Sequence, residues 1–142
     1  MGHKHSTRAD SSEGRVGIRW NRLLQQIPGY NAVGTAGQCI FDPKAAQHIL
    51  DFFTSCLTFI EGDHAKEPFT LEKWQQAILA NLFGWKRPDG TRRYREAFIF
   101  VPKKNGKTPL MAGVVVYFLF CEEEEGLQLY GAAADKDQAS LL

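Results

Sequence analysis

The sequence predicts an α/β fold in which two amphipathic helices precede a strand, a loop, a helix and a second strand. Three observations support this prediction. Apolar residues recur at steps of three and four between residues 41 and 84, which is the period of a helix with one buried face. Two apolar runs of strand length follow at residues 97–101 and 127–134. Between these runs, a Gly-Lys-Thr triplet stands directly before a long apolar segment.

Composition sets the limits of what the chain can be. It has 142 residues, 44% of them hydrophobic, which is enough to bury the core of one domain. The net charge of +1 neither indicates nor excludes nucleic acid, because charge acts through its local distribution. The three cysteines are widely spaced and form no C-x-x-C pair, which indicates a reducing cytosol rather than a disulfide framework or a zinc site. The longest apolar run, Leu110–Cys121, is shorter than the roughly 18 to 20 residues of a membrane span.

The N-terminal region, residues 1–40, is rich in glycine, serine and charge and has little periodicity. Such a composition favours a loosely ordered arm, with a short helix expected around Arg19–Ile27. Residues 41–142 are expected to form the ordered domain.

Capping and breaker residues predict where the two amphipathic helices begin and end. Asp42 can cap a helix whose first residue is Pro43, and the breaker at residues 61–63 is expected to end this helix. The second helix is expected to begin at Thr70 and to end at Gly84.

A polar segment with strong turn chemistry at Pro88–Asp89–Gly90 separates the helices from the first strand. Basic side chains gather from residue 86 to residue 107: they are Lys86, Arg87, Arg92, Arg93, Arg95, Lys103, Lys104 and Lys107. Two interpretations remain open for the first part of this stretch. It is either a solvated loop or a surface on which Arg92, Arg93 and Arg95 contact DNA phosphates or a partner subunit.

The strand, loop and helix around the Gly-Lys-Thr triplet predict a parallel βαβ unit with a phosphate-binding loop. Backbone N–H groups and the positive end of the helix dipole converge at such a loop, which suits a polyphosphate. Gly106 allows close backbone approach, Lys107 can reach the β and γ phosphates, and the Thr108 hydroxyl can bind a magnesium ion. The alternative is that the triplet only forms a turn before a core helix.

The loop is a variant, because Val101 stands where the usual G-x-x-x-x-G-K-[ST] pattern has its first glycine. The segment VPKKNGKT resembles the deviant phosphate loop of the large terminase subunits of tailed bacteriophages, the ATPase motors that package DNA. FTLEKWQQAILANLFGW resembles their adenine-binding segment, FDPKAAQHILDFF their leading helix, and LYGAAADKDQA their second strand and the helix after it. The resemblance covers about residues 35–142.

The resemblance implies a P-loop NTPase fold with a parallel sheet, of which this chain would hold an incomplete part. It also implies ATP and Mg²⁺ as ligands, held by Gln75 at the adenine and by residues 102–108 at the phosphates. The residues of this loop are Pro102, Lys103, Lys104, Asn105, Gly106, Lys107 and Thr108.

Many terminases carry a catalytic arginine at the position of Lys103. A lysine keeps the charge but loses the planar fork, so Lys104 is a second candidate for that role. Trp74, beside Gln75, is expected in the core.

The further implications concern partners and completeness. By resemblance, the partners are phage DNA, the terminase small subunit and the portal protein, in the cytoplasm of a bacterial host. The acidic strand and nuclease domain of such motors are not found in the sequence, and Glu122 is not accepted as the acidic residue because the preceding apolar residues favour a helix. We therefore expect an N-terminal part of the motor that does not turn over ATP alone and forms a ring only as a longer protein. The alternative is a nonenzymatic prophage remnant that binds DNA or a partner through residues 86–95.

Overall fold

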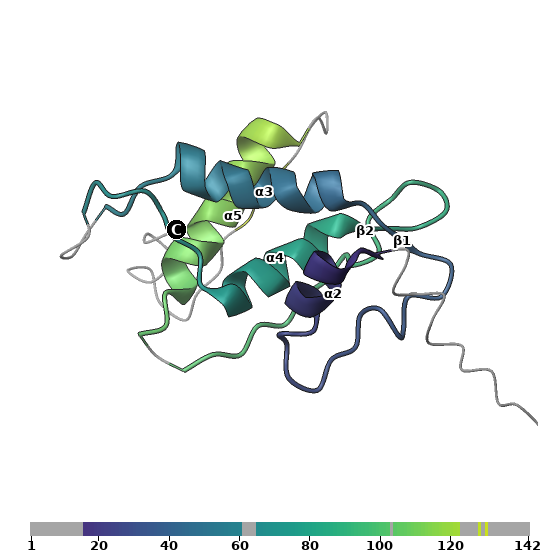
Figure 1. Cartoon of the computed structure of the whole chain (residues 1–142). Helices are drawn as coiled ribbons and strands as arrows, with labels where there is room; N and C mark the ends of the chain where they lie inside the picture. The colour runs from purple at the N-terminus through teal and green to yellow at the C-terminus, as the bar shows by residue number, and fades with distance from the viewer. Residues whose placement is uncertain (1–15, 61–64, 103, 123–127, 129, 131–142) are drawn as a thin grey trace, which may run out of the picture. The chain divides into compact units, whose positions relative to one another are not determined.

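The computed structural model describes residues 16–60, 65–102, 104–122, 128 and 130 (Figure 1). The chain divides into two compact units, Met1–Ala97 and Phe98–Leu142, and each is described by itself.

The described part of the first unit is built from helices α2 (Ile18–Leu24), α3 (Pro43–Cys56) and α4 (Lys73–Gly84). Both α2 and α3 pack against α4, as Figure 1 shows. Two short strands, β1 (Ile40–Phe41) and β2 (Trp85–Lys86), pair antiparallel beside them. Because β2 follows directly after α4 and β1 directly precedes Asp42 at the start of α3, this ladder ties the two helices together at one end.

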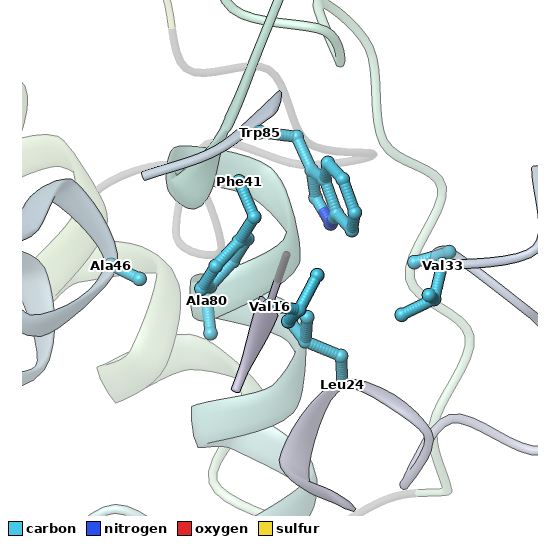
Figure 2. Close-up of a cluster of buried hydrophobic side chains, with 8 residues drawn as sticks. Val16, Leu24, Val33, Phe41, Ala46, Ala80 and Trp85 are labelled. Carbon is cyan, nitrogen blue, oxygen red and sulfur yellow. The ribbon is translucent and has the colours of Figure 1, made fainter. Parts of the chain in front are cut away.

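A hydrophobic cluster joins all these elements (Figure 2). It is centred on Leu24 of α2, Phe41 of β1, Ala80 of α4 and Trp85 of β2, and it also contains Val16, Ala32, Val33 and Ala46. The rings of Phe41 and Trp85 meet edge to face, with centroids 5.3 Å apart. Burial of this kind contributes roughly 1.5 to 3 kcal/mol for each large side chain.

The cluster differs from the expectation for residues 1–40. Val16, Leu24, Ala32 and Val33 are buried in it, so the second part of the expected loose arm belongs to the core. The expected short helix is present as α2, with bounds shifted from Arg19–Ile27 to Ile18–Leu24. Periodicity did not indicate this burial because residues 25–39 reach the core through successive turns, which have no fixed period.

The start of α3 agrees with the prediction. Asp42 is the N-cap, its carboxylate accepts hydrogen bonds from the N–H groups of Lys44 (2.9 Å) and Ala45 (3.2 Å), and Pro43 is the first helical residue. The predicted end at residues 61–63 is wrong, since α3 ends at Cys56.

Extended backbone replaces the expected last turn of α3. The Phe59 N–H donates to the carbonyl of Glu67 (3.0 Å), and the Phe59 ring stacks on Phe69 with centroids 4.6 Å apart. An isolated antiparallel bridge joins Thr58 to Pro68. These contacts with residues 67–69 provide hydrogen-bond partners for the backbone. They favour extended backbone here, although Leu57 and Ile60 continue the helical spacing.

The end of α4 at Gly84 was predicted correctly, whereas its start lies at Lys73 instead of Thr70. Glycine is required at the end because the backbone lies close to β1 and α3. A Cβ at Gly84 would come within 2.4 Å of the Phe41 ring and 3.0 Å of the Ala46 Cβ.

The described part of the second unit contains helix α5 (Lys107–Cys121), which the sequence predicted after the Gly-Lys-Thr triplet. The predicted strand at residues 97–101 is not formed: these residues are irregular, and Phe98 and Phe100 are 92% and 87% exposed. A strand depends on hydrogen bonds to a neighbour, and no described segment pairs with these residues. Most of the second predicted strand, residues 127–134, lies outside the described residues, and the described sheet is antiparallel.

Candidate functional site

The loop before α5 folds back on itself through its own backbone and one amide. The Asn105 Nδ2 donates to the Pro102 carbonyl at 3.2 Å. Lys104 and Gly106 both have left-handed backbones, with φ angles of 66° and 67°. This conformation is unrestricted for Gly106 but is strained for Lys104, and such strain is concentrated at functional loops. Lys103 lies outside the described residues.

The start of α5 coincides with the motif. Gly106 is the N-cap, and it has no side chain that could accept a hydrogen bond from the first turn of the helix. The Leu110 N–H donates to the Gly106 carbonyl at 3.1 Å, while Pro109 has no N–H. The backbones of Lys107 and Thr108 therefore stand at the positive end of a helix of 15 residues, and both residues are exposed. This arrangement suits an anion.

The donor set also fits the chemistry of a nucleotide and magnesium. An exposed ammonium group and an exposed hydroxyl, on Lys107 and Thr108, are adjacent at the uncapped helix start. A hydroxyl oxygen is a ligand that Mg²⁺ accepts when phosphate oxygens and water complete its octahedron. Among the described residues, no group of three or more His, Cys, Asp or Glu side chains could hold a metal.

Gln75 lies in the first unit, on the first turn of α4, and is 4% exposed. Its Oε1 accepts a hydrogen bond from the N–H of Glu72 at 2.8 Å, which is one half of a capping box. The neighbouring Gln76 donates from Nε2 to the Leu71 carbonyl at 2.8 Å. The side chain expected to contact adenine therefore also fixes the start of its own helix. The Glu-x-x-Gln spacing of Glu72 and Gln75 was the sequence signal for this box.

Of the three arginines singled out in the sequence, Arg93 is held within the fold. Its guanidinium donates to the Ala32 carbonyl (2.9 Å), the Thr35 carbonyl (2.5 Å) and the Thr35 hydroxyl (3.0 Å). It also lies over the rings of Trp85 and Tyr94, 5.3 and 4.8 Å from their centroids. These contacts fasten residues 32–35 to the segment after β2, so Arg93 is placed to stabilise the fold.

The other two arginines differ from Arg93. The Arg92 guanidinium lies over the Phe83 ring at 5.6 Å, and Arg95 is exposed. Arg92 is half-buried, so Arg95 is the one of these three arginines that is exposed, as the DNA-contact hypothesis requires.

Comparison with known proteins identifies a similarity in the region that carries the loop. Residues 73–142 match the sequence profile of the terminase large subunit, ATPase domain. This part of the chain is similar to that family. The resemblance inferred from VPKKNGKT is thereby confirmed, and the terminase match includes α4, the segment after it, the loop and α5. Neither a search of curated proteins nor a search of solved structures returned a match.

The structure adds a buried polar residue, within the region that matches the terminase profile, that the sequence did not indicate. Asn81, on α4, donates to the carbonyls of Leu24 (3.2 Å) and Ala77 (2.9 Å) and accepts from the indole N–H of Trp85 (3.1 Å). It joins α2, α4 and β2 through one amide. No sequence motif indicates such a residue, because its partner Leu24 is distant in the chain.

A second unexpected feature is a pair of tyrosines, Tyr30 and Tyr94, whose hydroxyl groups are hydrogen-bonded to each other. Burial, together with the hydrogen bond between Tyr94 and Tyr30, raises the pKa of Tyr94 well above its usual value. The pair fastens the turn at Tyr30 to the segment after β2, on the same side as Arg93. No described helix of this terminase-related chain is long and apolar enough to cross a membrane.

Proposed function

We propose that this chain binds ATP and Mg²⁺ at the loop of residues 102–108 and serves as part of the ATPase motor that packages phage DNA. The family match over residues 73–142, which includes the loop and α5, is the observation that carries this proposal. The uncapped start of α5 at Lys107 supports it, because backbone N–H groups at a helix start attract phosphate.

Each residue of the loop has a proposed role. Lys107 neutralises the β and γ phosphates, Thr108 completes the coordination of Mg²⁺, and the left-handed Gly106 lets the backbone approach the phosphates. Asn105 holds the loop closed through the Pro102 carbonyl. Lys103 and Lys104 are the two candidates for charge stabilisation in the transition state, with Lys103 at the position that carries the catalytic arginine in many terminases. When bound, Mg²⁺ would supply Lewis-acid neutralisation of the phosphate charge.

We also propose that Gln75 contacts the adenine while it caps α4. An amide can do both, since an oxygen with two lone pairs accepts two hydrogen bonds and the Nε2 group remains a donor. The hydrogen bond from Glu72 supports this proposal, because it fixes which end of the amide is the oxygen.

At the level of the fold, we propose that residues 41–142, together with the buried part of residues 16–33, form a terminase-like ATPase domain. We also propose that residues 97–101 enter a parallel sheet of the P-loop type in the assembled motor. The exposure of Phe98 and Phe100 supports this, because covering two aromatic rings is strongly favourable. The family leads us to propose phage DNA, the small subunit and the portal protein as partners, a ring of subunits as the working state of the motor, and the bacterial host cytoplasm as its location.

The substitution Lys107→Ala tests the nucleotide site. We expect it to weaken the binding of a fluorescent ATP analogue in the presence of Mg²⁺ by about tenfold or more, since a charge-assisted contact to phosphate is lost. The melting temperature should stay unchanged, because Lys107 is exposed.

The matched control is Lys73→Ala, which removes an exposed lysine from the first residue of α4. It should leave the affinity for the analogue unchanged. Equal affinity of the wild type and Lys107→Ala would reject the assignment of the loop.

A further inference from the structure

The segment after α4 folds into a tight hairpin, residues 85–95, which we call the basic hairpin. The Arg93 N–H donates to the Trp85 carbonyl at 2.9 Å, and the Arg87 N–H donates to the Thr91 carbonyl at 2.8 Å. These bonds extend the ladder beyond β2 as far as the turn. In Figure 1 the turn is the loop that projects beside β2.

The turn of the basic hairpin is fixed by its own acidic residue. The Asp89 carboxylate accepts hydrogen bonds from the N–H of Thr91 (2.9 Å) and from its hydroxyl (2.7 Å). The two hydrogen bonds, together with the nearby positive charge of Arg87, lower the pKa of Asp89. The Asp89 carboxylate therefore stabilises the turn through hydrogen bonds within the hairpin, and no ligand is needed for this conformation.

The basic hairpin has an inner and an outer face. On the inner face, Arg93 lies over the buried Trp85 and is held by carbonyl groups of the core segment 32–35. On the outer face, Lys86 stands directly opposite Arg92 in an antiparallel bridge. Residues directly opposite each other share a face, and like charges in such a pair are destabilising. The ladder therefore brings two cations together at a cost in stability.

Three further cations of the basic hairpin are Lys86, Arg87 and Arg95. The Arg87 guanidinium donates to the Arg93 carbonyl at 3.4 Å, and its charge also acts on Asp89. Arg87 and Arg95 are exposed, and Lys86 is half-buried. Of the two acidic residues in and next to the hairpin, Asp89 is engaged with Thr91, and Glu96 is a single charge. The hairpin thus carries a local excess of positive charge on a rigid support.

We propose that Lys86, Arg87 and Arg95 form a contact surface for the phosphate backbone of DNA. The proposal rests on the proposed function, in which DNA is the cargo of the motor. Phosphate is favoured over a carboxylate-bearing protein surface because phosphates recur at short intervals along a duplex, so several cations on one small hairpin can engage at once. Of the three arginines that the sequence placed in such a surface, Arg95 is kept. Arg92, which lies over the Phe83 ring, and Arg93, which is held by the core, are replaced by Lys86 and Arg87.

The test uses the full chain and a fluorescent duplex oligonucleotide, without nucleotide, over a series of salt concentrations. The variant Lys86→Gln, Arg87→Gln, Arg95→Gln removes three charges. We expect the slope of log Kobs against log salt to become shallower by about 2 to 3, and binding at low salt to weaken by about tenfold or more.

The control variant Arg22→Gln, Lys44→Gln, Lys73→Gln removes three exposed charges elsewhere in the first unit. It should change the slope by much less than the hairpin variant does. Melting temperatures of all variants show whether each is folded. An unchanged slope in the hairpin variant, or an equal change in the control, would overturn the proposal.

A competition experiment separates DNA from acidic protein. Displacement of the oligonucleotide by polyglutamate at the same concentration of charge would also overturn the proposal, because the surface would then not prefer phosphate. The assay contains no ATP, so a failure of the Lys107 experiment leaves its result intact and the two proposals can fail separately.

Discussion

A single buried amide, that of Asn81, joins three elements of the first unit by hydrogen bonds. It pairs the Trp85 indole N–H and the Leu24 carbonyl, two groups that would otherwise be buried without partners. Replacing Asn81 with leucine should lower the free energy of unfolding by about 3 kcal/mol, because an unpaired buried polar group costs about 1 to 3 kcal/mol. Urea denaturation measures this change.

A double-mutant cycle with Trp85→Phe provides the control, because phenylalanine has no N–H to leave unpaired. We expect the two substitutions to couple by about 1 kcal/mol. Strict additivity would mean that the Asn81 hydrogen bond to Trp85 contributes nothing to stability.

At the scale of the element, the start of α4 depends on Gln75, which is also the proposed adenine contact. Gln75→Leu removes the acceptor for the Glu72 N–H and should destabilise the protein by about 1 kcal/mol. Gln75→Glu keeps an acceptor oxygen at the positive end of the helix but loses the amide donor. We therefore expect Gln75→Glu to retain stability and to lose affinity for ATP.

Comparison of ATP with GTP gives the specificity of this effect. The loss in Gln75→Glu should be larger for ATP than for GTP, since the adenine edge is the proposed partner. Equal affinity for ATP in the wild type and Gln75→Glu would leave Gln75 with the capping role alone.

The elements also show how much the sequence could predict. The start of α3 and the end of α4 followed from local rules, since Asp42, Pro43 and Gly84 act within a few residues of themselves. The end of α3 at Cys56 depends on pairing of Phe59 with Glu67, and Val33 is buried in a cluster with residues distant in the chain, such as Trp85. Contacts between distant segments leave no periodic pattern, so these features could not be predicted.

At the scale of the whole molecule, the sequence predicted the helix start that carries the candidate site better than it predicted the sheet. The residues Gly106, Lys107 and Thr108 are contiguous, so their relation to a helix start could be predicted, and α5 begins among them. A strand at residues 97–101 would require a neighbouring strand. The apolar pattern of these residues does not indicate whether such a neighbour is present. The role of Arg93 was likewise set by its distant contacts with Ala32 and Thr35.

Amide hydrogen exchange with and without ATP and Mg²⁺ is the most direct test of the central claim that the loop and the start of α5 hold the nucleotide phosphates. We expect ATP to slow exchange in the segment 104–111, where the backbone N–H groups of Lys107 and Thr108 would bind phosphate, and Lys107→Ala to abolish this protection. Protection by ATP confined to other segments, or no protection at all at saturating ATP, would contradict that claim.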